Sequence, residues 1–206
     1  DQFFADRTIF SFRCPVTLSN DAKAKHSKLP EQFKLPANIY AIAIDDSKIQ
    51  RRLLAKYFSF AGIPETRVRI LGGTTEEIKG FNDWAFDFVT DHPDDFFLFI
   101  VDENLEVNDS DITATKEVTI SGSKCVSKIR QKLGPEQESR ILTLIRSAND
   151  SAEDVAIYSS RAHGYLPKVP IKPGAVLEEL TPLWLDRFPS YGGDLRHVKS
   201  DNHIPD

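Results

Sequence analysis

Apolar residues gather into five short runs along the chain, and stretches with helical periodicity separate these runs. The runs lie at 39–44, 67–71, 96–101, 141–146 and 164–168. Runs of this length are typical of strands, and the uninterrupted run at 96–101 is typical of a strand buried on both faces. We therefore predict five strands.

The stretches between the strands carry apolar residues three and four positions apart, which predicts helices at 47–62, 76–92, 122–134, 151–162 and 173–188. In the first helix Ser47 is a suitable N-cap and Gly62 a suitable C-cap residue. Five βα units with strands this apolar predict an α/β fold whose parallel sheet is covered on both faces. The predicted inward stripe of the first helix is Ile49, Leu53, Leu54, Tyr57 and Phe58.

The ends of the chain lack this alternation. Residues 8–16 alternate like a strand of another unit, residues 17–37 resemble a linker, and residues 189–206 resemble a disordered tail. We expect an N-terminal arm and linker at 1–37, one domain at 38–188 and a flexible tail at 189–206. Within the domain, residues 103–121 are polar and predict a long loop with room for a short strand.

The composition of the chain argues against several classes of protein. No apolar run approaches the roughly 18–20 residues that span a bilayer, and the net charge of −5 disfavours general nucleic-acid binding. Two cysteines do not make a disulfide framework, so we expect a reducing, cytoplasmic location. The chain contains no methionine, and we expect it to be a segment or a processed product of a longer protein.

Four of the five strand ends carry residues that suit chemistry. The first strand ends at Asp45 and Asp46, the third at Asp102, the fourth at Ser147 and the fifth at Lys168. Because parallel strands bring their carboxyl ends to one rim of the sheet, we expect these side chains to lie together.

Three clustered carboxylates repel one another unless a cation joins them, and Mg²⁺ is bound by carboxylates, waters and phosphate oxygens. Asp102, alone on the central strand, is the candidate nucleophile for phosphoryl transfer, with Asp45 and Asp46 as metal ligands. Ser147 and Lys168 could each meet part of the charge on a phosphoryl group.

Each residue also has an ordinary structural explanation. Acidic pairs favour helix N-termini, an aspartate often forms a turn, a serine often caps a helix, and a lysine is usually solvated. Their occurrence together, in order, at four separate strand ends favours the chemical interpretation.

The pattern IDDS…VDENL…IRSAND…GYLPK resembles the receiver domain of two-component response regulators over residues 38–188. The resemblance implies a flavodoxin-like, doubly wound five-stranded parallel sheet with helices on both faces. It further implies that this domain catalyses its own phosphoryl transfer and slow autodephosphorylation. The roles that it implies are Mg²⁺ ligation by Asp45, Asp46, Asp102 and the Asn104 carbonyl, phosphoryl acceptance by Asp102, assistance by Ser147 and Lys168, and switching by Ser147 and Tyr165.

Several features depart from that family's pattern. The loop after the acceptor is long, and Lys168 is followed by Val169 before a proline, so a register using Lys172 stays open. The segment RTIFSFRCPV at 7–16 resembles the closing strand of histidine-kinase ATP-binding domains. That resemblance implies the C-terminal receiver of a hybrid histidine kinase, while an unrelated arm remains an alternative.

The expected partner is a histidine kinase or a histidine phosphotransfer protein, and the sequence leaves a homodimer open. Three alternatives remain: an unphosphorylated docking module, a hydrolase with an aspartyl nucleophile, and a flavodoxin. Asn104 disfavours the hydrolase, because a second acid is expected there, and the acids of IDDSKIQ disfavour the flavodoxin. We expect His163 at the surface, Cys125 in the core, and output through residues 151–162 and the last two strands.

Overall fold

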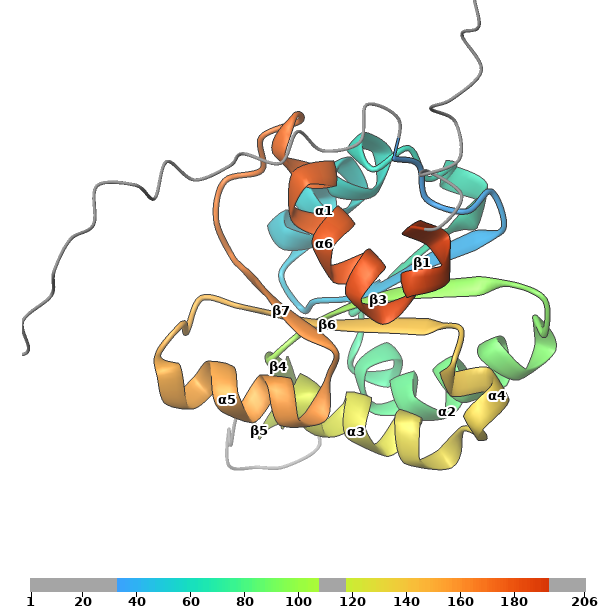
Figure 1. Ribbon diagram of the computed structural model, residues 1–206. Coiled ribbons are helices and arrows are strands. Elements are labelled where there is room, and N and C mark those ends of the chain that lie inside the picture. The colour runs from blue at the N-terminus through green and yellow to red at the C-terminus, as the bar shows by residue number, and fades with distance from the viewer. Residues whose placement is uncertain (1–32, 108–117, 193–206) are drawn as a thin grey trace, which may run out of the picture.

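The computed structural model describes residues 33–107 and 118–192, and these contain a five-stranded parallel sheet with strand order β2-β1-β3-β6-β7 (Figure 1). The central position of β3 follows from its sequence, because every side chain of this strand after the first is buried. The strands of this sheet are β1 (Ile39–Ile44), β2 (Val68–Leu71), β3 (Phe96–Asp102), β6 (Ile141–Ser147) and β7 (Gly164–Pro167).

Helices cover both faces of the sheet (Figure 1). One core cluster joins a face of the sheet to α2, α3 and α5, and the other joins the opposite face to α1 and α6. This is the predicted flavodoxin-like, doubly wound α/β fold. The helices are α1 (Lys48–Phe60), α2 (Thr75–Asp91), α3 (Gly122–Lys132), α4 (Pro135–Glu138), α5 (Ala152–Arg161) and α6 (Ala175–Arg187), and the 3₁₀ helices are η1 (Glu65–Arg67) and η2 (Pro189–Gly192).

Alternation along β3 assigns its side chains to the two layers. Phe97, Phe99 and Val101 belong to the core cluster on the α2, α3 and α5 side, whereas Leu98 and Ile100 belong to the cluster on the α1 and α6 side. Asp102 follows at the next position of the second set, so it lies at the carboxyl end of the strand on the α1 and α6 side.

The predicted inward stripe of α1 is correct for Leu54, Tyr57 and Phe58, which are buried, and wrong for Ile49. The Ile49 side chain is 68% exposed. It lies in the first turn of α1, just after the carboxyl end of β1, and does not join either core cluster. Ser47 is the N-cap, and its hydroxyl accepts the backbone N–H of Gln50.

The predicted long loop after β3 contains an antiparallel hairpin of β4 (Asn104–Val107) and β5 (Val118–Ser121). Leu105 and Val107 are fully buried in the core cluster on the α2 side, so the hairpin is part of the domain core. The short helix α4 was also not predicted.

Several predictions concern the ends of the chain. The strand at 8–16 and most of the predicted linker lie outside the described residues. Phe33, within the predicted linker, packs into the core cluster with α1 and α6. The first residues of the predicted tail form η2, and the rest lie outside the description.

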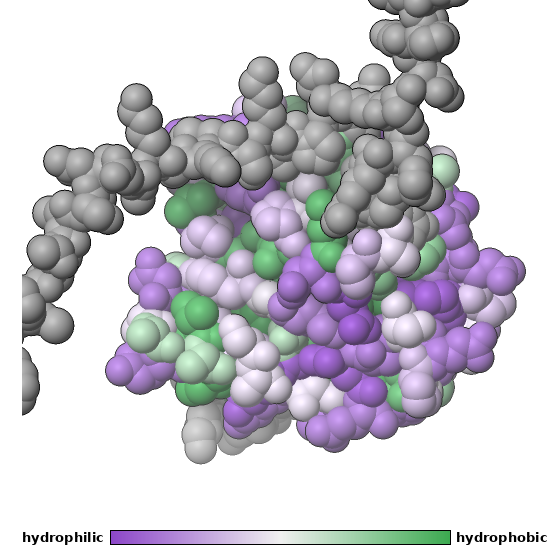
Figure 2. Space-filling view, viewed as in Figure 1, coloured by the Kyte–Doolittle hydropathy of each residue, from purple (hydrophilic) through white to green (hydrophobic). Residues whose placement is uncertain are grey.

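The surface in Figure 2 is largely hydrophilic over α3 and α4, while hydrophobic residues come to the surface over α5. Ile157 of α5 is one of the large apolar side chains that the structure exposes. In the part of the chain that is described, no helix has the length and apolar character needed to cross a bilayer.

Candidate functional site

Three carboxylates meet at the carboxyl-terminal rim of the sheet. Asp45 and Asp46 follow β1, Asp102 ends β3, and each offers one oxygen within 4.8 Å of the others. Asp45 and Asp102 are only 1% and 4% exposed, and Asp46 is half-buried. The rim position that the sequence predicted for all three acids is therefore observed.

The ammonium of Lys168, which follows β7, reaches two of these acids. Its Nζ lies 2.8 Å from Oδ1 of Asp102 and 3.2 Å from Oδ2 of Asp45. Its backbone N–H donates to the carbonyl of Ser147, which holds the residue beside the end of β6. Lys172, the residue of the alternative register, is exposed.

Burial controls the protonation of the two inner carboxyls. Desolvation raises the pKa of Asp102 to about 6, and the Lys168 ammonium opposes this increase only in part. Burial also raises the pKa of Asp45, against the attraction of Lys168. Two acids that resist ionisation are suited to a cation, which would restore the charged form of both.

The loop that carries Asp45 is held rigidly. The Arg51 guanidinium donates to three backbone carbonyls, those of Asp45 at 2.8 Å, Asp46 at 2.7 Å and Gly72 at 2.8 Å. Gly72 has a φ of 101°, and a Cβ at this position would overlap the carbonyl of Asp45. The backbone N–H of Ser47 also donates to Oδ1 of Asp45 at 2.9 Å.

The acceptor candidate is held by two features that sequence analysis missed. Gly122 starts α3 directly against Asp102, and a Cβ on Gly122 would overlap the carbonyl of Asp102. The Glu103 carboxylate accepts the Ser121 hydroxyl at 2.7 Å and the Ser123 backbone N–H at 2.8 Å. A carboxylate at a helix N-terminus is favourable, so Glu103 ties the residue after Asp102 to α3. In the sequence, the adjacent Gly122 and Ser123 are the residues that could have indicated this close contact at the start of the helix.

Ser147 is buried at the end of β6. Its Oγ accepts the backbone N–H of Asn149 at 3.1 Å and the hydroxyl of Tyr158 at 3.3 Å. The Tyr165 hydroxyl donates to the Ser147 carbonyl at 3.1 Å, and the rings of Tyr158 and Tyr165 stack with centroids 5.6 Å apart. Asn104 starts β4 opposite Ser121, with its side chain exposed.

Arg146 is a buried charge that sequence analysis did not single out. It pairs in register with Asp102 across β6 and β3, and it is 5% exposed. Its Nη1 donates to Oε1 of Gln50 in α1 at 2.8 Å. Desolvation lowers the pKa of the guanidinium, and the nearby carboxylates of Asp45 and Asp102 counteract that effect.

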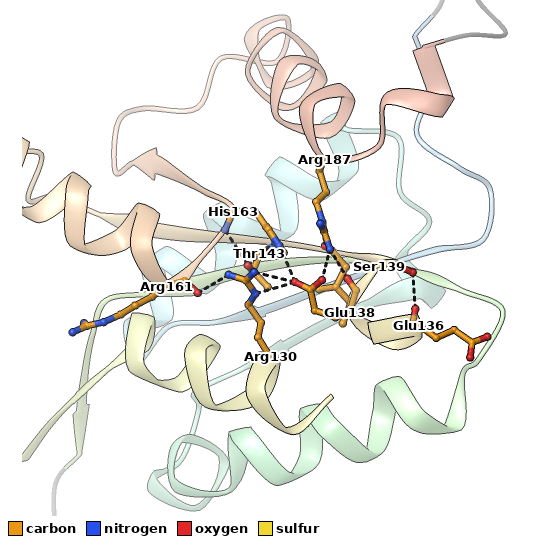
Figure 3. A network of polar contacts seen from close by, with 9 residues as sticks. Arg130, Glu136, Glu138, Ser139, Thr143, Arg161, His163 and Arg187 are labelled. Carbon is orange, nitrogen blue, oxygen red and sulfur yellow. Dashed lines mark hydrogen bonds and ion pairs between the residues drawn. The ribbon is translucent and has the colours of Figure 1, made fainter. Parts of the chain in front are cut away.

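The prediction that His163 lies at the surface is wrong, because its side chain is 12% exposed and fully hydrogen-bonded (Figure 3). Its Nδ1 accepts the backbone N–H of Thr143, and its Nε2 lies 3.0 Å from Oε1 of Glu138. Glu138 also pairs with Arg130 at 3.0 Å and Arg187 at 2.7 Å. Burial and the two arginines lower the pKa of His163 to about 4, so its neutral form prevails at neutral pH.

This second polar network lies near the amino-terminal end of β6, away from the acids. Figure 3 shows it joining side chains from α3, α4 and α6 beside the sheet. Cys125, by contrast, is buried as predicted, and burial raises the pKa of its thiol.

No family model and no curated protein matches this chain. Solved structures of similar fold include Vibrio cholerae chemotaxis protein CheY4, with 20% identity, 70% coverage of this chain, 98% of that chain and a TM-score of 0.48. A response regulator receiver protein from Dyadobacter fermentans shows 17% identity, coverages of 71% and 98%, and a TM-score of 0.49.

A probable two-component system response regulator/GGDEF domain protein has a TM-score of 0.50 at 16% identity. This chain matches it over 73% of its own length and about half, 51%, of the length of that protein. Identities this low carry information about the fold alone. The chain therefore shares its doubly wound fold with part of that probable response regulator/GGDEF domain protein.

Proposed function

We propose that this domain is a phosphorelay receiver that accepts a phosphoryl group on Asp102 from a phosphohistidine and changes conformation as a result. The observation that carries the proposal is the convergence of acids from two strand ends on the ammonium from a third. Lys168 Nζ lies 2.8 Å from Asp102 and 3.2 Å from Asp45. A solvated surface lysine would not be expected to form ion pairs with two buried carboxylates, as Lys168 does.

The acid cluster fits a divalent cation. Oδ2 of Asp45 is buried, and among the described residues its close polar neighbour is the Lys168 ammonium, which forms an ion pair with it at 3.2 Å. Such an oxygen suits direct ligation, and Mg²⁺ prefers oxygen ligands. Asp45, Asp46 and Asp102 would hold the ion, with the Asn104 carbonyl as a further candidate ligand. Bound Mg²⁺ would neutralise charge on the phosphoryl oxygens.

The transfer step needs few protein groups. A carboxylate oxygen of Asp102 attacks phosphorus and the P–N bond to the donor imidazole breaks. The electron pair of that bond stays on the imidazole nitrogen, and the ring leaves neutral because its other nitrogen already carries a proton. The Lys168 ammonium is placed to attract an oxygen of the transferred group. The Ser147 hydroxyl requires a reorientation, because it now accepts hydrogen bonds from Asn149 and Tyr158.

That reorientation supplies the proposed switch. If the Ser147 hydroxyl turns to the phosphoryl group, the Tyr158 hydroxyl loses its acceptor, and the stacked ring of Tyr165 can repack. Tyr165 also donates to the Ser147 carbonyl, so the two events are joined through one residue. The change would be read on α5 and β7, where Ile157 is exposed.

The proposed donor is a histidine kinase or a histidine phosphotransfer protein. Two exposed apolar side chains are close in sequence to residues of the site: Ile49, in the first turn of α1 shortly after Asp46, and Val169, directly after Lys168. Apolar side chains beside a charged site favour docking of a protein that brings its phosphohistidine to the rim. Placement at the end of a hybrid histidine kinase remains a proposal from the sequence of residues 7–16.

Intact-mass measurement after treatment with acetyl phosphate and Mg²⁺ tests the proposal. We expect one added phosphate that hydroxylamine removes, and no addition in Asp102→Asn or in the presence of a chelator. Asp83→Asn, at an exposed acid on α2, is the matched control and should accept phosphate normally. No mass gain in the folded wild type would reject phosphoryl acceptance and favour a docking module. Turnover of phosphate esters would favour a hydrolase.

A further inference from the structure

We propose that Arg146 is an internal counter-charge of the acid cluster, which weakens divalent-cation binding and favours the phosphorylated over the unphosphorylated form. The inference rests on the proposed function, and Arg146 acts through the carboxylates without touching the phosphoryl group. It is therefore a residue that sets the charge of the site, distinct from the groups that carry out transfer.

The position of Arg146 supports this role. In β6 it is the register partner of Asp102, and neighbouring strands lie only about 4.8 Å apart. Its side chain lies on the α1 and α6 side, where it borders a small cavity together with Leu54, Ile100 and Val176. Asp102 belongs to the same side of the sheet, as the alternation along β3 shows. The buried Arg146 side chain thus lies on the same side of the sheet as Asp102, where Lys172 and Glu179 also line the cavity.

Among the described residues, the guanidinium of Arg146 forms no direct ion pair. Its side chain donates to the neutral amide of Gln50, and within the described residues no carboxylate lies within 4.0 Å of it. The carboxylates that act on it from further away are those of Asp45, Asp102 and Glu179. A buried cation without a paired anion is costly, so the acid cluster is the main source of its compensation.

The charge balance of the site follows. Three carboxylates face the Lys168 ammonium and the Arg146 guanidinium, and the Arg51 guanidinium binds the backbone carbonyls of Asp45 and Asp46. Without the charge of Arg146 the site would be more negative by one unit. A more negative cluster binds a divalent cation more tightly. Phosphorylation replaces the single charge of Asp102 with that of a phosphoryl group, about −1.5 to −2. The buried guanidinium favours this added negative charge, and unlike Mg²⁺ it is always present.

Isothermal titration of Mg²⁺ into the wild type, Arg146→Met and Arg146→Lys tests the inference. At low ionic strength we expect Arg146→Met to bind Mg²⁺ about three- to tenfold more tightly than the wild type. Arg146→Lys retains the charge and should stay close to the wild type. Lys132→Met is the matched control, because it removes one exposed positive charge far along α3 and should leave Mg²⁺ affinity unchanged.

The phosphorylated state gives the second readout. At saturating Mg²⁺, the half-life of the acetyl phosphate-labelled form should fall about three- to tenfold in Arg146→Met and stay near wild type in Arg146→Lys. If Arg146→Met does not fold, Arg146→Gln, which keeps a donor for Gln50, is measured in its place.

Equal Mg²⁺ affinities in the folded wild type and the neutral variant overturn the inference and leave phosphoryl acceptance intact. Looser Mg²⁺ binding in the neutral variant also overturns it, because Arg146 would then only support the fold of the site. Tighter Mg²⁺ binding in the neutral variant, combined with a wild type that takes up no phosphate, upholds the counter-charge and rejects the proposed function.

Discussion

Replacing Asp102 by asparagine should stabilise the metal-free protein at neutral pH, although it removes the proposed acceptor. Asp102 is 4% exposed, and desolvation raises its pKa from 3.8 to about 6. Between pH 3.8 and about 6, the Asp102 carboxyl therefore keeps its proton in the folded protein but has lost it in the unfolded chain. Stability from this group is greatest near pH 4, falls as the pH rises to about 6, and stays low above it.

The magnitude follows from the two pKa values. The interval from 3.8 to about 6 corresponds to about 3 kcal/mol of destabilisation at pH 7 and above. Asparagine has nearly the same shape and no charge, so it removes this cost. Lys168 loses one partner but retains Asp45 at 3.2 Å. We expect a net gain of about 1–3 kcal/mol at pH 8 and a much smaller difference at pH 4.

Urea unfolding in the presence of a chelator, at pH 4 and pH 8, measures both differences. Asp46→Asn serves as the control, because Asp46 is only half-buried and lies in the same cluster. It should change stability less than Asp102→Asn does. A variant at 102 that is less stable than the wild type at pH 8, or a stability difference that is the same at both pH values, would refute the reasoning.

Three further changes have expected outcomes. Gly122→Ala should lower the free energy of unfolding by more than about 3 kcal/mol in urea, because its Cβ would overlap the Asp102 carbonyl. The control Gly80→Ala, in an open position of α2, should raise it by about 0.5–1 kcal/mol, and equal effects of the two variants would contradict the reasoning. Arg51→Met should lose about 1–3 kcal/mol in urea unfolding, because three carbonyls around the acids lose their donor; unchanged stability would contradict the positioning role. The wild type should lose up to about 3 kcal/mol of stability as the pH falls from 6.5 to 4, because the pKa of His163 is about 4 in the folded protein and 6.5 in the unfolded chain. His163→Gln should abolish this pH dependence, and parallel pH profiles of unfolding for the two proteins would contradict the reasoning.

Much of the fold could be predicted because its signals are local. Each of the five strands coincides with an apolar run, and the helices between them begin and end within a few residues of the predicted limits. Ile49 was misplaced because periodicity reports which residues share a helix face, not where the sheet below that face ends. The hairpin was missed because Leu105 and Val107, the buried residues of its described strands, are two apolar residues within a polar stretch.

The candidate site could be predicted in part for a similar reason. Parallel strands bring their carboxyl ends together whatever the details, so the meeting of Asp45, Asp102 and Lys168 followed from topology alone. The roles of Gly122 and Arg146 depend on contacts between segments distant in sequence. A glycine or arginine in isolation gives no sign that its Cα or its charge lies against a particular aspartate.

The paired strands β4 and β5 lie between the acid cluster and the segment that connects the two strands in sequence. Val107 and Val118 are register partners, so the ends of the two described strands lie side by side. Because the two strands are paired at this point, we expect changes in the length of the sequence between them to transmit little strain to Asp102. This gives the protein a tolerant insertion point a few residues from its candidate reactive group, where a fluorescent tag or a recognition peptide could report on the rim.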